Sequence, residues 1–133
     1  MKIGADTGFL IALTADHPQA LRYWYQIISG KSSLVLSGLS INELLTYCYK
    51  RGTGDTARVL VEQLKDLATI DIEPVSLEIA EKGAGFRHGL GMSTADAIIL
   101  ATLVLAGCDL LLTQDDDFAP VQEQGLLAVE WLV

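Results

Sequence analysis

Residues 89–107 read GLGMSTADAIILATLVLAG, and this stretch decides the fold class. Its second half is almost uninterrupted apolar sequence, which predicts a helix from Ser93 to Ala106 that is buried on nearly all sides. The apolar run is too short to span a bilayer. A core helix is therefore expected, and Asp96 in its first turn is expected beside apolar segments rather than in open solvent.

The rest of the chain alternates between strand-like and helix-like segments. Strands are predicted at 2–5, 33–36, 68–72, 110–113 and 127–131. Helices are predicted at 8–15, 17–30, 40–50, 55–67, 76–88 and 93–106. This alternation predicts an α/β fold, with a central, mostly parallel sheet of four to five strands between two layers of helices. At 133 residues the chain is expected to form one domain over residues 1–133.

The composition excludes several classes of protein. Half of the residues are hydrophobic, which argues against disorder. The N-terminus has no extended apolar core of the kind that a signal peptide needs. We therefore expect no membrane association and a cytoplasmic location. Cys48 and Cys108 have no CxxC spacing and lie in apolar patterns, which predicts buried, reduced thiols.

Four acidic residues are each placed where an apolar strand-like run gives way to a helix-like run. They are Asp6, Glu43, Asp96 and Asp115. No lysine, arginine or histidine lies near them in sequence to compensate their charge, so a divalent cation is the economical partner. We predict that Asp6, Asp96 and Asp115 coordinate this cation and that Glu43 ligates it or orients an attacking water. Such a site is typical of metal-dependent phosphodiester chemistry.

Each acid also has a purely structural interpretation. The spacings Ser40-x-x-Glu43 and Ser93-x-x-Asp96 both match a capping box, in which the acid binds the N-cap amide. Asp6 matches a turn or cap residue. The run at 115–117 would favour the positive end of a short helix. These interpretations weaken when all four acids are taken together, because each lies at a strand end or at the start of a helix beside the central one.

The chain resembles the PIN-domain ribonucleases, and among them the VapC-type toxins. Four stretches carry the resemblance: DTGFLIAL (6–13), SINELL (40–45), GLGMSTADAIILATLVLAG (89–107) and LLTQDDDF (111–118). The resemblance implies an acidic quartet of Asp6, Glu43, Asp96 and Asp115, with Asp117 as a further ligand. It also implies a Mg²⁺- or Mn²⁺-dependent endoribonuclease that leaves a 5′-phosphate and a 3′-hydroxyl, is commonly a homodimer and is often silenced by a small antitoxin.

Contacts to an RNA substrate are predicted for two hydroxyls and two guanidinium groups. They are those of Thr7, Thr113, Arg51 and Arg87. The net charge of −8 argues against a nucleic-acid partner, but metal ions at the acidic cluster would offset much of the local charge. The acidic surface and the unusual Asp116 favour an alternative: a PIN-like scaffold that binds a partner protein with little or no nuclease activity.

Overall fold

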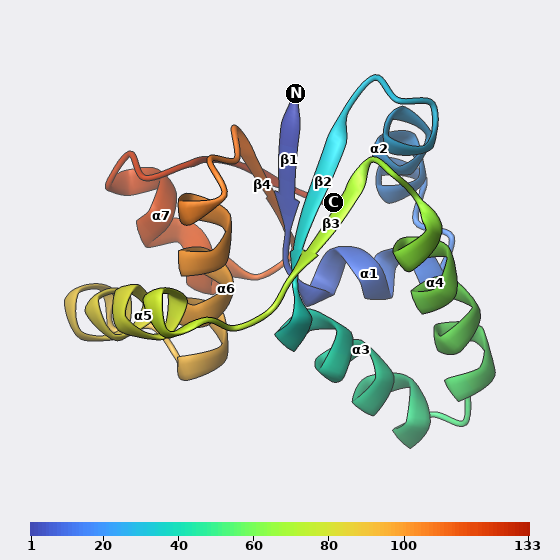
Figure 1. Cartoon of the computed structure of the whole chain (residues 1–133), viewed down its shortest axis with the longest axis horizontal. Helices are drawn as coiled ribbons and strands as arrows, with labels where there is room; N and C mark the ends of the chain where they lie inside the picture. The colour runs from blue at the N-terminus through green and yellow to red at the C-terminus, as the bar shows by residue number, and fades with distance from the viewer.

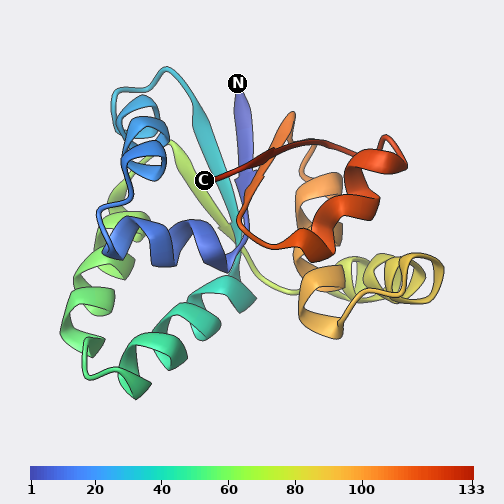
Figure 2. The same ribbon diagram turned by 180° about the vertical axis from the view of Figure 1, so that it is seen from behind.

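The computed structural model describes all residues, 1–133, and shows five parallel strands in one sheet (Figures 1 and 2). The strands are β1 (Lys2–Ala5), β2 (Ser33–Ser37), β3 (Ile70–Glu73), β4 (Leu110–Thr113) and β5 (Ala128–Trp131). Their order in the sheet is β3-β2-β1-β4-β5. Every neighbouring pair is parallel. The predicted parallel sheet of four to five strands is confirmed.

Helices cover both faces of the sheet, so the three-layer architecture is also confirmed. On one side lie α1 (Thr7–Thr14), α2 (Pro18–Ile28), α3 (Gly38–Lys50) and α4 (Gly54–Asp66). On the other side lie α5 (Leu77–Leu90), α6 (Thr94–Leu105) and α7 (Ala119–Glu123). Figure 2 shows the same two groups from behind, with α1 and α7 toward the viewer.

Alternating side chains of the strands divide the core between these two helical layers. Ile3 and Ala5 of β1 pack in the core beneath α1–α4, whereas Val35 of β2 packs in the core beneath α6. Gly4 faces α6 so closely that a Cβ atom there would lie 2.7–3.0 Å from the end of the Leu103 side chain. The helix predicted to be central thus packs directly on the middle strand.

The serine half of the capping box is observed at the start of α6, whereas the box is wrong at the start of α3. Ser93 caps α6, because its Oγ accepts a hydrogen bond from Asp96 N at 3.3 Å. α3, however, begins at Gly38 and is capped by Ser37, whose Oγ accepts from Leu39 N at 3.1 Å. Ser40 is inside the helix, and its buried hydroxyl has no partner. The capping-box interpretation of Ser40 and Glu43 is therefore wrong.

Two further expectations concern the cysteines and the membrane. Cys48 and Cys108 are both buried free thiols, as predicted. No single helix has the length and apolar character needed to cross a membrane. α5 and α6 taken together have that length and apolar character, but the two helices are bent by 119° relative to each other.

The strand order places a topological switch between β1 and β4. From β1 the chain moves outward through β2 to β3, and it then returns to the other side of β1 to build β4 and β5. Helices therefore leave the carboxyl ends of β1 and β4 on opposite faces of the sheet, and a crevice opens between them. Ligands of open α/β sheets bind at such a crevice.

Candidate functional site

A cavity of about 430 Å³ opens at the carboxyl ends of β1 and β4. It is lined by Asp6, Thr7, Gly8, Glu43, Asp96, Ile99, Gln114 and Asp115. All four acids of the predicted quartet therefore reach the same cavity, from four segments that are far apart in the chain. Gly8, Ile99 and Gln114 were not among the predicted residues; Gly8 and Gln114 are direct neighbours of predicted ones in the sequence.

Asp6 is held in a fixed orientation between β1 and α1. It is 5% exposed and caps α1, with Oδ1 accepting a hydrogen bond from Phe9 N at 3.2 Å. Oδ2 accepts a hydrogen bond from the Thr113 hydroxyl. A Cβ atom at position 8 would lie 3.2 Å from Asp6 Oδ1, so glycine at this position leaves room for the carboxylate. The cap interpretation of Asp6 is thus confirmed, and the capping carboxylate lines the cavity as well.

Thr113 links the ends of β1 and β4. Besides donating to Asp6, its Oγ1 accepts a hydrogen bond from Asp115 N at 2.9 Å. Asp115 in turn caps the short 3₁₀ turn Asp116–Phe118, accepting from Asp117 N at 2.9 Å. The buried ring of Phe118 anchors this turn in the core. A continuous set of hydrogen bonds therefore fixes the acidic loop relative to Asp6.

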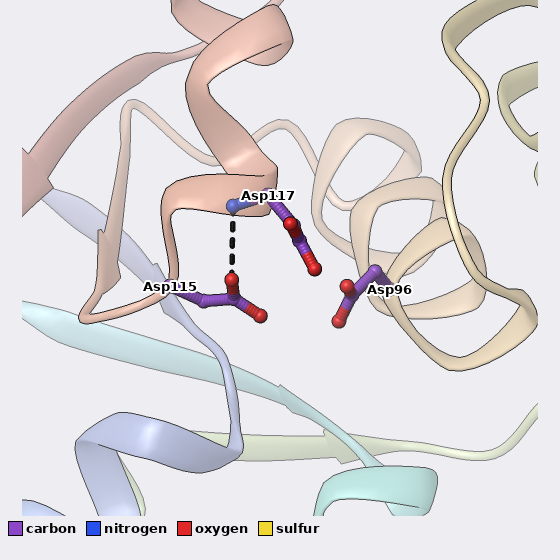
Figure 3. Close-up of side chains that lie close together, drawn as sticks. All are labelled: Asp96, Asp115 and Asp117. Carbon is purple, nitrogen blue, oxygen red and sulfur yellow. Dashed lines mark hydrogen bonds between the residues drawn. The ribbon is translucent and has the colours of Figure 1, made fainter.

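Asp96 faces this loop from the first turn of α6. One carboxylate oxygen each from Asp96, Asp115 and Asp117 lies within 4.8 Å of the others. Figure 3 shows the three carboxylates gathered around a common space between the acidic turn and α6. Three of the four predicted metal ligands thus come together as one cluster. The fourth, Asp6, lines the neighbouring part of the cavity, and both of its oxygens accept hydrogen bonds from the protein.

Glu43 enters the cavity from α3, between the two ends of that helix. Its Oε1 accepts a hydrogen bond from the Thr7 hydroxyl at 2.6 Å. Because Ser37 caps α3, Glu43 is not needed at the helix N-terminus. Thr7 and Thr113, which we predicted to contact the substrate, each donate to a carboxylate of the cavity in this structure.

Two carboxyl groups of the cavity have pKa values above the ordinary value for aspartate. Burial raises the pKa of Asp6 from 3.8 to about 6, against hydrogen bonds from Thr113 and Phe9 that lower it. The pKa of Asp96 is also raised to about 6, first by burial and then by the negative charge of Asp115, with smaller contributions from Asp117 and Glu43. No lysine or arginine lines the cavity. The site therefore holds negative charge that the protein itself does not neutralise.

This donor set fits a hard divalent cation. All candidate ligand atoms are carboxylate oxygens, which Mg²⁺ and Mn²⁺ prefer, and neither histidine nor cysteine lines the cavity. Repulsion among the clustered carboxylates would be relieved by a bound cation. Asp96, Asp115 and Asp117 would be the residues to share one ion, because their oxygens lie within 4.8 Å of one another.

The two predicted arginines lie in different surroundings. Arg87 lines a second hollow of about 580 Å³ beside the acidic turn, together with Ser93, Asp116 and Asp117. Arg51 is the C-cap of α3, two turns of helix beyond Glu43, and does not line the cavity.

Comparisons with solved structures find similar folds. A chain of a toxin–antitoxin complex from Klebsiella pneumoniae is 25% identical, with a TM-score of 0.67 over 90% of this chain and 92% of that chain. VapC20 of Mycobacterium tuberculosis, described as a sarcin–ricin loop-cleaving toxin, is 22% identical, with a TM-score of 0.73 over 90% and 94%. A chain of VapBC2 from Rickettsia felis, solved bound to a promoter DNA fragment, is 14% identical, with a TM-score of 0.75 over 98% of both chains.

The sequence itself was compared with curated proteins and with family models. No curated protein matches it significantly. The model of the PIN domain matches residues 4–124, which include the cavity, the acidic turn and all five predicted acids. The chain therefore belongs to the PIN-domain family.

Proposed function

We propose that the protein is a Mg²⁺- or Mn²⁺-dependent endoribonuclease and the toxin of a toxin–antitoxin pair, with residues 1–133 forming a single PIN domain. One observation carries the proposal: Asp6, Glu43, Asp96 and Asp115 line one cavity, and no lysine, arginine or histidine lines it with them. PIN domains are generally nucleases, and the similar solved structures are toxins or toxin–antitoxin complexes.

In this proposal the acids have distinct roles. Asp96, Asp115 and Asp117 would hold the cation, and Asp6 would complete the site from the end of β1. When bound, such an ion polarises a phosphoryl oxygen and lowers the pKa of water in its coordination sphere. Glu43, held by Thr7, would accept a hydrogen bond from the attacking water and orient it for in-line attack on phosphorus. The bond between phosphorus and the 3′-oxygen would break and the 3′-oxygen would take up a proton, so cleavage would leave a 5′-phosphate and a 3′-hydroxyl.

Cleavage of RNA by the purified protein tests the nuclease. Single-stranded and structured RNA would be incubated with the protein and Mn²⁺, beside the variants Asp115→Asn and Asp71→Asn. Asp71 is an exposed residue of β3, so its variant matches the loss of charge without touching the cavity. We expect Mn²⁺-dependent cleavage that Asp115→Asn abolishes and Asp71→Asn retains. Equal cleavage by all three proteins would point to a contaminating nuclease and would contradict the proposal.

The proposed protein partners are a small antitoxin and a second copy of the chain. The proposal of an antitoxin is supported by the solved structures of similar chains, two of which are toxin–antitoxin complexes. Expression of the protein alone should arrest growth, and co-expression with the neighbouring open reading frame should relieve the arrest. The homodimer is proposed from the family and from the aromatic side chains on α2, of which Tyr25 is largely exposed. Light scattering of the purified protein tests it.

The alternative, a scaffold that binds a protein and cleaves nothing, makes the opposite prediction. It is favoured by Asp116, which adds an exposed negative charge to the second hollow, the one that Arg87 also lines. No cleavage of any RNA in Mn²⁺, together with tight binding of a small basic peptide, would support the scaffold and contradict the nuclease.

A further inference from the structure

The turn between α3 and α4 carries two pairs of arginine and tyrosine, one stacked and one joined by a hydrogen bond. Arg51 lies over the ring of Tyr47, with its Cζ 3.5 Å from the ring centroid, and its Nη1 donates to the Tyr47 carbonyl at 3.4 Å. Arg58 lies 5.4 Å from the ring centroid of Tyr49 and donates from Nε to its hydroxyl at 3.3 Å. We call Tyr47, Tyr49, Lys50, Arg51 and Arg58 the α3–α4 corner. Each of its guanidinium groups contacts a tyrosine of α3.

Glycine at position 54 makes this arrangement possible. A Cβ atom on Gly54 would lie 2.5 Å from Cδ1 of Tyr49, which is closer than packed atoms approach. The tyrosine ring therefore rests against the backbone at the start of α4. Gly52, two residues earlier, has a φ of +73°, a conformation that side chains other than glycine rarely adopt. The chain turns sharply here, and this turn brings Arg58 of α4 beside Tyr49 of α3.

The α3–α4 corner is a concentration of positive charge on an acidic protein. It contains three of the nine lysine and arginine residues, whereas the chain has seventeen acids. All three cations are exposed. One acid, Asp55, approaches Arg58 at 3.9 Å, and that pair is largely solvent-exposed, so it neutralises little of the local charge.

A single stripe of α3 connects the corner with the cavity. Glu43, Tyr47 and Arg51 follow each other at intervals of four residues, so each lies about 40° around the helix from the one before it. Glu43 lines the cavity, and Arg51 lies about 12 Å farther along the helix axis. Figure 1 shows α3 leading from the carboxyl end of the sheet outward to the turn before α4.

We propose that the α3–α4 corner binds the single-stranded part of the RNA substrate on one side of the scissile phosphate. This inference rests on the proposed nuclease function. One plane of the Arg51 guanidinium lies against Tyr47, and the exposed opposite plane suits an unstacked base, while its remaining N–H groups suit a phosphate. Lys50 and Arg58 would add phosphate contacts. The corner thus supplies the attraction for RNA that the acidic cavity lacks.

An acidic protein segment is the competing occupant, and the geometry favours RNA over it. Carboxylates would be attracted by the charge alone, but a stacked guanidinium with an open plane also contacts aromatic rings, and every nucleotide of an unstacked RNA strand supplies such a ring. The stripe on α3 also starts at Glu43, the residue that would face the attacking water. An RNA strand that lies along this stripe therefore leads directly into the cavity.

Binding of RNA to a catalytically silent background tests the proposal without depending on turnover. The background is the full chain with Asp115→Asn, and the probe is a short fluorescein-labelled single-stranded RNA of mixed sequence, followed by anisotropy over a series of salt concentrations. The added variants are Arg51→Ala, Arg51→Lys and Lys31→Ala. Lys31 is exposed just before β2, at the opposite end of the sheet, so Lys31→Ala removes the same charge away from the corner.

We expect Arg51→Ala to weaken RNA binding about tenfold and to reduce the slope of log affinity against log salt by about 0.7. Arg51→Lys should restore the slope but only part of the affinity, because lysine keeps the charge and loses the plane. Lys31→Ala should change the affinity less than about twofold. The melting temperature of each variant checks that the fold is retained.

Three outcomes would overturn the proposal. One is equal weakening by Arg51→Ala and Lys31→Ala, which would indicate only long-range attraction. Another is unchanged RNA affinity in Arg51→Ala. The third is binding of polyglutamate that depends on Arg51 while RNA binding does not, which would assign the corner to an acidic protein. If any of these occurs while the wild-type protein cleaves RNA in Mn²⁺, the nuclease proposal still stands. If the wild type cleaves no RNA and binds no metal, the nuclease proposal fails whatever the corner binds.

Discussion

The hydroxyl oxygen of Thr7 lies 2.6 Å from Oε1 of Glu43 and donates a hydrogen bond to it across 36 positions of sequence. The bond joins the first turn of α1 to the middle of α3, two helices that leave different strands. It restricts the rotation of a carboxylate that would otherwise be free to turn toward solvent. Thr7 is therefore a positioning residue for Glu43.

Replacing Thr7 by valine should lower RNA cleavage by about ten- to a hundredfold, the range found when groups that orient ligands or reacting groups are removed. Thr7→Ser should retain most of the activity, because serine keeps the hydroxyl. The comparison is made on kcat at saturating RNA, with melting temperatures as a check on folding. Loss of activity in the serine variant but not in the valine variant would show that the methyl packing of Thr7 matters rather than its hydrogen bond.

Stability in the absence of divalent metal should fall as the pH rises. The folded protein holds a proton on Asp6 with a pKa of about 6, against 3.8 as the ordinary value, so it binds more protons than the unfolded chain between these values. The free energy of unfolding therefore decreases from about pH 4 to above pH 6, by about 3 kcal/mol at most for this residue. Asp96 acts in the same direction, with a smaller effect because it is half exposed.

Urea denaturation in a chelating buffer over this pH range measures the effect. The variant Asp6→Asn should lose most of the dependence, since asparagine does not titrate. A wild-type protein that gains stability with rising pH would contradict the raised pKa. Added Mg²⁺ or Mn²⁺ should restore stability at neutral pH in the wild type, because binding to the folded state alone shifts the equilibrium toward it.

Metal binding should release protons near pH 6. At that pH Asp6 and Asp96 are partly protonated, whereas a coordinated cation favours their charged forms. Calorimetric titration with Mn²⁺ in two buffers of different ionisation enthalpy gives the number of protons released. We expect a release that disappears toward about pH 8, where both groups are already charged. A binding enthalpy that is independent of the buffer at pH 6 would show that neither carboxylate is linked to the metal.

The sequence predicted the fold and the cavity for one physical reason. Parallel strands bring their carboxyl ends to one edge of the sheet, so acids that follow strands far apart in the chain are expected to meet there. Asp6 after β1 and Asp115 after β4 follow this rule directly, and they lie on neighbouring strands. Asp96 was placed by the apolar character of its helix, which required α6 to pack against the middle of the sheet.

The sequence did not predict which individual side chains contact one another. Neither the bond from Thr7 to Glu43 nor the stack of Arg51 on Tyr47 leaves a local pattern, because each depends on how the helix packs or how its last turn closes. The short helix α7 was also missed, since five residues are too few for a periodic pattern; Pro120 in its first turn was the available signal. At α3 the motif Ser40-x-x-Glu43 competed with Ser37, and the serine that directly follows the strand became the cap.

The contact between Gly4 and Leu103 predicts a destabilised core on substitution. A methyl group at position 4 would meet the Leu103 side chain at 2.7–3.0 Å, so Gly4→Ala should lower the free energy of unfolding by about 1–3 kcal/mol through overpacking. Adding Leu103→Ala removes the opposing methyl groups. The double variant should therefore be less destabilised than the sum of the two single variants, which a double-mutant cycle measures. Additive effects would show that the backbone of β1 moves instead.

Substitution of the two serines of α3 separates the true cap from the apparent one. Ser37→Ala should lower the free energy of unfolding by about 1 kcal/mol, because the Leu39 amide loses its acceptor. Ser40→Ala should be neutral or stabilising, since it replaces a buried hydroxyl that has no hydrogen-bond partner with an apolar methyl group. Both are measured by urea denaturation in the same buffer. If the order were reversed, α3 would have to begin at Ser40, and Glu43 would then be bound to the helix N-terminus instead of facing the cavity.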